Sequence, residues 1–239
     1  MKIDFHTHIL PGMDDGAENE SDSLQMLEML KGQGIEIAVL TPHYYRDENT
    51  VEEFLERRNA SYNRLLQAAE NKDIPEIMTG AEVRMWRDMS REDLLPLCIE
   101  NTNMILCEMP FDYRDFVIDE LEELPFSGYV PVIAHIDRYF KLYPPEKMKR
   151  IIDLKCVIYQ VNTSALSGMT MRRQLLRMAA ENQAVFVLGT DCHGISYRTP
   201  DIKARYHNKK SLRGLFMHTV ENNEDFFLKE DLAQIHKKS

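Results

Sequence analysis

The chain has 239 residues, of which 44% are hydrophobic, and a formal net charge of −10 at pH 7. A chain of this length can bury one substantial core, so we expect a single domain over residues 1–239. The acidic balance argues against a nucleic-acid partner, because proteins that bind nucleic acid carry a basic stripe on their surface.

Cysteine usage and the apolar runs indicate a cytoplasmic protein. The opening segment contains Asp4, His6 and His8, which a secretory signal would not place in its apolar region. No run approaches the length of a membrane-spanning helix, so no membrane insertion is expected. The cysteines show no C-x-x-C spacing, so no disulfide framework is expected. They are Cys98, Cys107, Cys156 and Cys192.

Short apolar runs alternate with amphipathic stretches along the whole chain. In chain order we predict a strand over Lys2–His8, a helix over Ser21–Gln33, a strand over Ile35–Thr41, a helix over Val51–Lys72, strands over Glu76–Val83 and Met104–Glu108, a helix over Phe116–Leu124, a strand over Val130–Ala134, a helix over Pro145–Lys155, a strand over Val157–Asn162, a helix over Met169–Asn182, a strand over Val185–Thr190 and a helical tail over Ser211–His236. This alternation predicts parallel strands joined by helical crossovers, as in an α/β barrel.

Six of the seven predicted strands end at residues that bind metal ions. These residues are His6 and His8, His43, Glu82, Glu108, His135, and Asp191 with His193. The carboxyl ends of the strands in a parallel barrel all face one mouth, so we expect these side chains to meet there. His6 and His8 alternate on their strand and therefore point to the same side. A single H-x-H pair is a weak signal, but the repeated position makes the set specific.

Mixed imidazole and carboxylate ligands suit manganese, iron or zinc and do not decide among them. Manganese is the favoured expectation. The set is too large for one ion and predicts two or three divalent ions that share carboxylate bridges. Asp14 and Asp15 follow the first strand, and one of them is a candidate for a further ligand. Aspartates before a glycine are also common turn residues, so this pair could serve the turn alone.

The ordered set of motifs resembles the polymerase-and-histidinol-phosphatase (PHP) superfamily, and most closely its bacterial tyrosine phosphatases of the capsular-polysaccharide type. The motifs are Asp4-x-His6-x-His8 with Asp14-Asp15-Gly16, Pro42-His43, Gly80-Ala81-Glu82, Glu108, Ala134-His135-Ile136-Asp137-Arg138, Gln160-Val161-Asn162-Thr163-Ser164, and Asp191-Cys192-His193 with Arg198. They span most of the chain. Asp137, where the family often has Glu, and Cys192, which need not be Cys, depart from the pattern without changing a ligand.

The resemblance implies a distorted seven-stranded barrel with a trinuclear metal site. One ion would take His6, His8, Glu82 and Asp191, a second would share Glu82 and add Glu108 and His135, and the third would take Asp15, His43 and His193. Arg138 and Arg198 would hold phosphate oxygens. The implied substrate is a phosphotyrosine protein, a bacterial tyrosine kinase that controls surface-polysaccharide export.

The expected reaction is hydrolysis of a phosphate monoester by hydroxide generated at the metal ions. The two arginines would neutralise charge on the phosphoryl group, although each could also be a surface ion pair, Arg198 more so. Several tyrosines follow strand ends, and one of them is expected to stack on the phosphotyrosine ring. The candidates are Tyr44, Tyr45, Tyr113, Tyr139 and Tyr197.

Four alternatives stay open at this point. Cys192 and Arg198 form a C-x5-R-T string, the pattern of thiol-based tyrosine phosphatases, although such spacing arises easily by chance. A metal-dependent amidohydrolase barrel also opens with H-x-H, but usually places a lysine or a further histidine at later strand ends. Histidinol-phosphate hydrolysis is the nearest alternative within the superfamily. A non-catalytic module that uses the ions for structure is the fourth.

Overall fold

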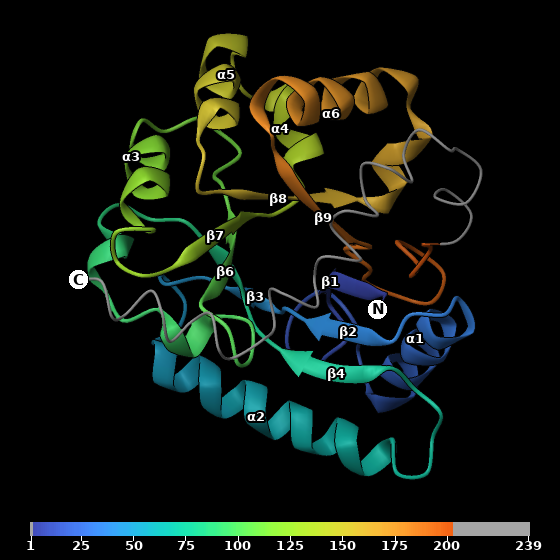
Figure 1. Ribbon diagram of the computed structural model, residues 1–239. Coiled ribbons are helices and arrows are strands. Elements are labelled where there is room, and N and C mark those ends of the chain that lie inside the picture. Colours follow the sequence, from blue (N-terminus) through green and yellow to red (C-terminus); the bar gives the residue numbers. More distant parts are fainter. Residues whose placement is uncertain (1, 203–239) are drawn as a thin grey trace.

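The computed structural model describes residues 2–202 and places six α-helices around parallel sheets (Figure 1). The helices are α1 (Glu20–Gly32), α2 (Val51–Ala68), α3 (Phe116–Glu123), α4 (Ile136–Leu142), α5 (Pro145–Asp153) and α6 (Met169–Asn182). Five of them match predicted helices. The short α4 was not predicted, and the predicted tail helix over Ser211–His236 lies outside the described residues. None of the helices in residues 2–202 has the length and apolar character needed to cross a membrane.

The strands form two parallel sheets. One has the order β1-β2-β4, with β1 at Ile3–Thr7, β2 at Ile37–Leu40 and β4 at Glu76–Thr79. The other has the order β3-β5-β6-β7-β8-β9. Its strands are β3 (His43–Tyr44), β5 (Glu82–Arg84), β6 (Met104–Glu108), β7 (Val130–Ile133), β8 (Ile158–Asn162) and β9 (Val185–Gly189). The predicted alternation of parallel strands and helices is confirmed.

One predicted strand is divided, and a short strand that was not predicted begins at the same level. The predicted strand Glu76–Val83 divides into β4 and β5, and the prediction Ile35–Thr41 covers β2, with β3 beginning just after Pro42. Leu40 pairs with Thr79 before the break, and His43 pairs with Glu82 after it. Pro42 has no N–H to donate, but its carbonyl accepts from the Glu82 N–H at 3.0 Å. The two neighbouring strands therefore bend together and carry His43 and Glu82 into the second sheet.

The predicted distorted seven-stranded barrel is not confirmed. Within residues 2–202 the ladders form two separate sheets, and β1 meets the end of β9 through an isolated bridge between Thr7 and Cys192. Two backbone hydrogen bonds reinforce that meeting. The Asp191 N–H donates to the His6 carbonyl at 2.8 Å, and the His8 N–H donates to the Cys192 carbonyl at 3.0 Å. The first and last strands thus lie together where the site residues gather.

The ladder between β1 and β2 contains an irregularity between Asp4 and Thr7. Successive strand residues normally point to opposite faces, and an extra residue in one strand re-aims a side chain. Phe5 belongs to an apolar cluster that lies among the strands, yet the next residue, His6, points into the site. The site lies at the end of that cluster, so the consecutive residues Phe5 and His6 both face inward, and the extra residue in β1 makes this possible.

The site residues lie at the end of that apolar cluster. On β6, Met104 and Leu106 belong to it, and Glu108 is the next residue on the same face. A larger apolar cluster packs the helices against the sheets, with Leu27 and Leu30 of α1 and Phe54 of α2 fully or almost fully buried. The packed core therefore holds the strand ends, and their polar side chains, in fixed positions.

Candidate metal centre

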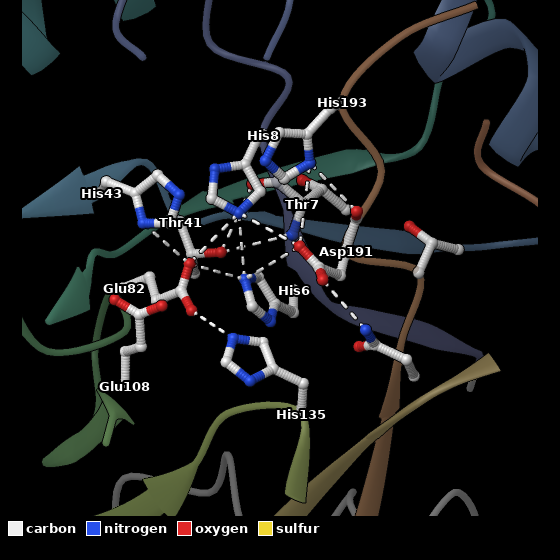
Figure 2. A network of polar contacts seen from close by, with 12 residues as sticks. His6, Thr7, His8, Thr41, His43, Glu82, Glu108, His135, Asp191 and His193 are labelled. Atoms are coloured by element: carbon white, nitrogen blue, oxygen red, sulfur yellow. Dashed lines mark hydrogen bonds and ion pairs between the residues drawn. The ribbon is translucent and has the colours of Figure 1, made fainter. Parts of the chain in front are cut away.

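All nine predicted metal ligands converge at one place, and Figure 2 labels each of them except Asp15. Their potential ligand atoms lie within 4.8 Å of one another in four overlapping groups. The groups are His8, Asp15, His43 and His193; His6, Glu82 and His135; His6, His8 and Asp191; and His43, Glu82 and Glu108. Residues that are far apart in the sequence meet because parallel strands end at a common edge, and the breaks after β2 and β4 bring His43 and Glu82 to the same place.

His6 and His8 project from the end of β1 with their Nε2 atoms 3.0 Å apart. The other ring nitrogen of each histidine is held from behind. His6 Nδ1 lies 3.0 Å from Gln160 Oε1, and His8 Nδ1 lies 2.7 Å from Asp14 Oδ2. A carbonyl or carboxylate at Nδ1 favours the tautomer that keeps Nε2 free as a ligand. Both imidazoles thus present Nε2 to the same point.

Glu82 is the central acid of the cluster. Its Oε2 lies 3.1 Å from His6 Nε2, 3.3 Å from His8 Nε2 and 3.0 Å from His43 Nδ1. Its Oε1 lies 2.7 Å from His135 Nε2. The side chain is fully buried. Because both carboxylate oxygens face imidazoles from different strands, Glu82 has the placement of a bridging ligand.

Asp14 and Asp15 play different parts. Asp14 accepts from the His43 backbone N–H at 3.0 Å in addition to its contact with His8, so it orients two histidines at once. Asp15 has an exposed side chain, with Oδ1 3.3 Å from His193 Nε2 and 3.6 Å from His43 Nε2. The geometry therefore favours Asp15 as the ligand and Asp14 as the residue that holds ligands in place.

The polypeptide comes close to the site at two glycines. A Cβ atom on Gly189 would lie 2.6 Å from His6 Cβ and 2.7 Å from Gln160 Nε2. A Cβ atom on Gly16 would lie 2.1 Å from the His8 carbonyl oxygen. Neither position has room for a side chain, so the backbone can pass directly behind the two histidines.

Asp191 and the two predicted arginines occupy the other side of the site. Arg138 lies with Nη2 3.3 Å from Asp191 Oδ2 and Nη1 3.8 Å from Glu108 Oε1. Arg198 contacts Asp191 Oδ1 through Nη2 and places Nη1 3.1 Å from His193 Nε2. Both guanidiniums are partly exposed, so Asp191 positions two cations at the edge of the cluster.

Two residues without a predicted role in the cluster support it from β8. Asn162 donates to Asp191 Oδ2 at 2.9 Å and accepts from Gln160 Nε2 at 3.0 Å. Gln160 Oε1 also accepts from the His135 backbone N–H at 2.5 Å. His135 has a φ of 32°, a left-handed conformation that this bond supports. The QVN motif was visible in the sequence, but only the fold shows what it contacts.

The charges in the cluster depend on one another. Burial opposes charge on His6 and His8, but nearby acids outweigh it and raise both pKa values, through Glu82 and Asp191 at His6 and chiefly through Asp14 at His8. Burial likewise opposes charge on Glu82 and Asp191, but the imidazoles around them hold both pKa values well below the usual range. The carboxylates therefore attract positive charge, and protons compete there with metal ions.

Three buried polar atoms test whether this set fits metal ions. Glu108 Oε2, His43 Nδ1 and His135 Nδ1 have no hydrogen-bond partner in the described part of the chain. His43 Nδ1 lies 3.0 Å from Glu82 Oε2 without the alignment of a hydrogen bond. Burying unpaired polar atoms is costly. A cation shared with Glu82 would satisfy Glu108 Oε2 and His43 Nδ1, whereas His135 faces Glu82 through Nε2 and keeps Nδ1 unpaired. The oxygen and nitrogen donors match the preferences of manganese, iron and zinc.

The geometry disfavours the thiol alternative. Cys192 is fully buried, and burial and the neighbouring Asp4 raise the pKa of its thiol above the usual range. A nucleophilic cysteine needs an accessible thiolate. Arg198, which would complete the thiol motif, contacts Asp191 and His193 instead.

The tyrosines considered for stacking on a phosphotyrosine ring differ in exposure. Tyr44 and Tyr139 are buried and cannot meet a substrate ring, whereas Tyr197 is exposed.

The chain is similar to proteins that are named tyrosine-protein phosphatases. A family model described as "Capsular polysaccharide synthesis, CpsB/CapC" matches residues 2–225. The chain is 31% identical to the tyrosine-protein phosphatase YwqE of Bacillus subtilis over 88% of this chain and 82% of that protein. It is 28% identical to the tyrosine-protein phosphatase CpsB of Streptococcus pneumoniae over 90% of this chain and 95% of that protein.

A solved structure gives the same result. A chain from the crystal structures of YwqE and CpsB, described there as unique metal-dependent tyrosine phosphatases, matches with a TM-score of 0.73 and 25% identity. The match covers 94% of each chain. The resemblance predicted from the motifs is therefore confirmed, and the chain belongs to the CpsB/CapC family of capsular polysaccharide synthesis.

Proposed function

We propose that this chain is a metal-dependent protein-tyrosine phosphatase. The observation that carries the proposal is the pair Arg138 and Arg198, held by Asp191 beside a buried cluster of imidazoles and carboxylates. The identity to YwqE and CpsB, which are named tyrosine-protein phosphatases, supports the same reaction. The cluster alone would suit several hydrolases, whereas two adjacent guanidiniums favour a phosphoryl group.

The nine donors would hold two or three divalent ions, with manganese favoured. His6, His8, Glu82 and Asp191 would hold one ion, Glu82 with Glu108 and His135 a second, and Asp15, His43 and His193 a third. The proximity of His8 to the Asp15 group supports a shared role for that histidine. When bound, such ions stabilise charge on phosphoryl oxygens and lower the pKa of water.

The chain's own residues would bind and orient the phosphate ester. A guanidinium has five N–H donors, and the contacts of Arg138 and Arg198 with Asp191 use only part of them. The remaining donors can bind phosphoryl oxygens as negative charge shifts in the transition state. Because Asp191 fixes both guanidiniums in advance of substrate binding, little reorganisation is needed during the reaction.

We further propose a bacterial tyrosine kinase of capsule or exopolysaccharide synthesis as the phosphotyrosine protein that this chain acts on, and the cytoplasm as the place of the reaction. The description of the family supports the connection to capsule synthesis. The breaks between β2 and β3 and between β4 and β5, together with the contact between β1 and β9, support a distorted seven-stranded barrel as the arrangement of the single domain.

The test is a metal-exchange experiment with three substrates. Chelation should remove activity toward a phosphotyrosyl peptide, and added manganese should restore it. The restored enzyme should hydrolyse the peptide with a higher kcat/KM than histidinol phosphate or an amide substrate. Faster turnover of histidinol phosphate would assign the chain to small-molecule hydrolysis. Manganese binding that raises the melting temperature without any turnover would leave a metal-stabilised, non-catalytic protein.

A further inference from the structure

An exposed aromatic residue borders the site on the side of Glu108. Phe111 follows β6 by three positions and keeps 49% of its surface exposed. Two arginines approach its ring, with Cζ of Arg84 at 5.7 Å and Cζ of Arg138 at 5.9 Å from the ring centre. Because Arg138 also contacts Asp191 and Glu108, the ring lies next to the proposed phosphate position.

Strand register places Arg84 at the mouth of the site. Arg84 pairs with Glu108 across the β5–β6 ladder and lies two residues beyond Glu82, on the same face of β5. Tyr45 follows His43 and Tyr44, which pair with Glu82 and Val83. The next step of that register brings Tyr45 beside Arg84, whose Cζ lies 5.5 Å from the Tyr45 ring centre. Arg84 therefore lies between two aromatic rings.

These contacts form a continuous series that begins at His43, a candidate ligand. The Tyr45 ring stacks on His43 with centroids 5.2 Å apart and planes 18° apart. The series runs from His43 through Tyr45, Arg84 and Phe111 to Arg138. The Arg84 guanidinium lies against the Tyr45 and Phe111 rings, and its charge also acts on the nearby Glu108 carboxylate. Phe111 is thus positioned by the same side chains that border the cluster.

The chemistry of the ester matches this arrangement. The phenyl ring of phosphotyrosine is joined to phosphorus through one oxygen, so a bound phosphoryl group leaves the ring at the rim of the site. Aromatic rings attract one another in offset-stacked or edge-to-face contacts, and burying a ring that is exposed to water adds to that attraction. An alkyl phosphate has no ring to place there.

We propose that Phe111, positioned by Arg84, is the subsite that receives the phenyl ring of a phosphotyrosine side chain. The inference rests on the proposed phosphatase function and adds the residue that selects aryl over alkyl phosphates. Arg84 acts through Phe111 as a positioning residue. The sequence pattern assigned ring stacking to a tyrosine, whereas the exposed ring beside Arg138 is a phenylalanine.

The test uses non-hydrolysable inhibitors, so that the ease with which a leaving group departs does not enter. Benzylphosphonate and ethylphosphonate are titrated against the manganese-loaded enzyme. Phe111→Ala should raise the inhibition constant of benzylphosphonate by about three- to tenfold, as the loss of one ring contact predicts, and leave that of ethylphosphonate unchanged. Phe111→Tyr should restore the benzyl preference. Arg84→Met, which keeps the side-chain length but removes the charge, should lower the preference by a smaller factor.

Two control variants match these changes. Phe126→Ala removes a phenylalanine that is 87% exposed and precedes β7, at the opposite end of the parallel strands. Arg91→Met removes an exposed arginine that pairs with Asp88. Neither should alter the ratio of the two inhibition constants. Melting temperatures of all variants show whether they fold.

Two results would overturn the inference. If Phe111→Ala weakens the binding of both phosphonates equally, or of neither, the ring is not an aryl subsite. The proposed phosphatase function is unaffected by that result. If the manganese-loaded wild-type enzyme binds neither phosphonate and hydrolyses no phosphate ester, the proposed function fails together with the inference.

Discussion

The candidate ligands at the centre of the site and those at its edge differ in how their side chains are held. The inner residues His6, His8 and Glu82 are fully buried, and each faces several other cluster residues. At the edge of the site, Asp15 lies on the loop after β1 and keeps 69% of its side chain exposed. Inner side chains are fixed by strand backbone and by one another, whereas outer ones can adjust to water or substrate. We therefore expect substitution of a ligand at the centre to be more damaging than substitution of a ligand at the edge.

The largest effect is expected from Glu82→Gln. The change removes the charge that faces four imidazoles, so bound metal should decrease and activity toward a phosphotyrosyl peptide should fall by about a thousandfold, as expected when metal-ion catalysis worth several kcal/mol is lost. Metal content and kcat/KM are measured on the same sample. Glu122→Gln, on the exposed surface of α3, is the control. Activity within tenfold of wild type would contradict a bridging role for Glu82.

The next effect is expected at the two arginines. Arg138→Met and Arg198→Met should each lower kcat/KM by about a hundredfold, since each removes a fixed donor to the charge of the transition state. Their metal content should stay at the wild-type level, because neither is a ligand. Arg150→Met on the exposed face of α5 serves as the control. An arginine whose loss leaves kcat/KM unchanged is a surface ion pair and nothing more.

A smaller effect, on manganese binding, is expected from substitution of Asp14 or Asp15. Asp14→Asn should weaken manganese binding by about ten- to a hundredfold, the usual effect of losing a residue that orients ligands. Asp15→Asn should weaken it less, because water can replace an exposed carboxylate. Titration of the metal-free protein with manganese measures both. The reverse order would mean that the exposed acid contributes more than the partly buried one.

The smallest effect is expected from Cys192→Ala. The thiol is buried and its raised pKa keeps it protonated at neutral pH, so activity should stay within about twofold of wild type. Removing a buried side chain of this size should lower stability by about 1 kcal/mol and the melting temperature by about 2–4 °C. A loss of activity without a loss of metal would restore the thiol mechanism.

The meeting of the candidate ligands at one place could be predicted because these residues follow a rule of position. Strand ends in a parallel α/β fold face one edge, so His43, Glu82 and Asp191 could be grouped from their places along the chain. The breaks between β2 and β3 and between β4 and β5 were not predicted, although Pro42 and Gly80 stand in them, because only pairing between neighbouring strands shows that each chain continues into the second sheet. The short α4 was also missed, because its start at His135 depends on a contact with Gln160 rather than on a local capping residue.

Residue types and their order along the strands were sufficient by themselves to indicate a metal-dependent phosphatase of this family, because the chemistry needs those donors and a parallel sheet gathers them. Only the tertiary structure decided which aspartate faces His8, which side chains orient Asp191, and that Phe111 lies beside Arg138. Those contacts join residues on different elements, and their geometry depends on register, bends and close backbone approach, which no local pattern in the sequence encodes.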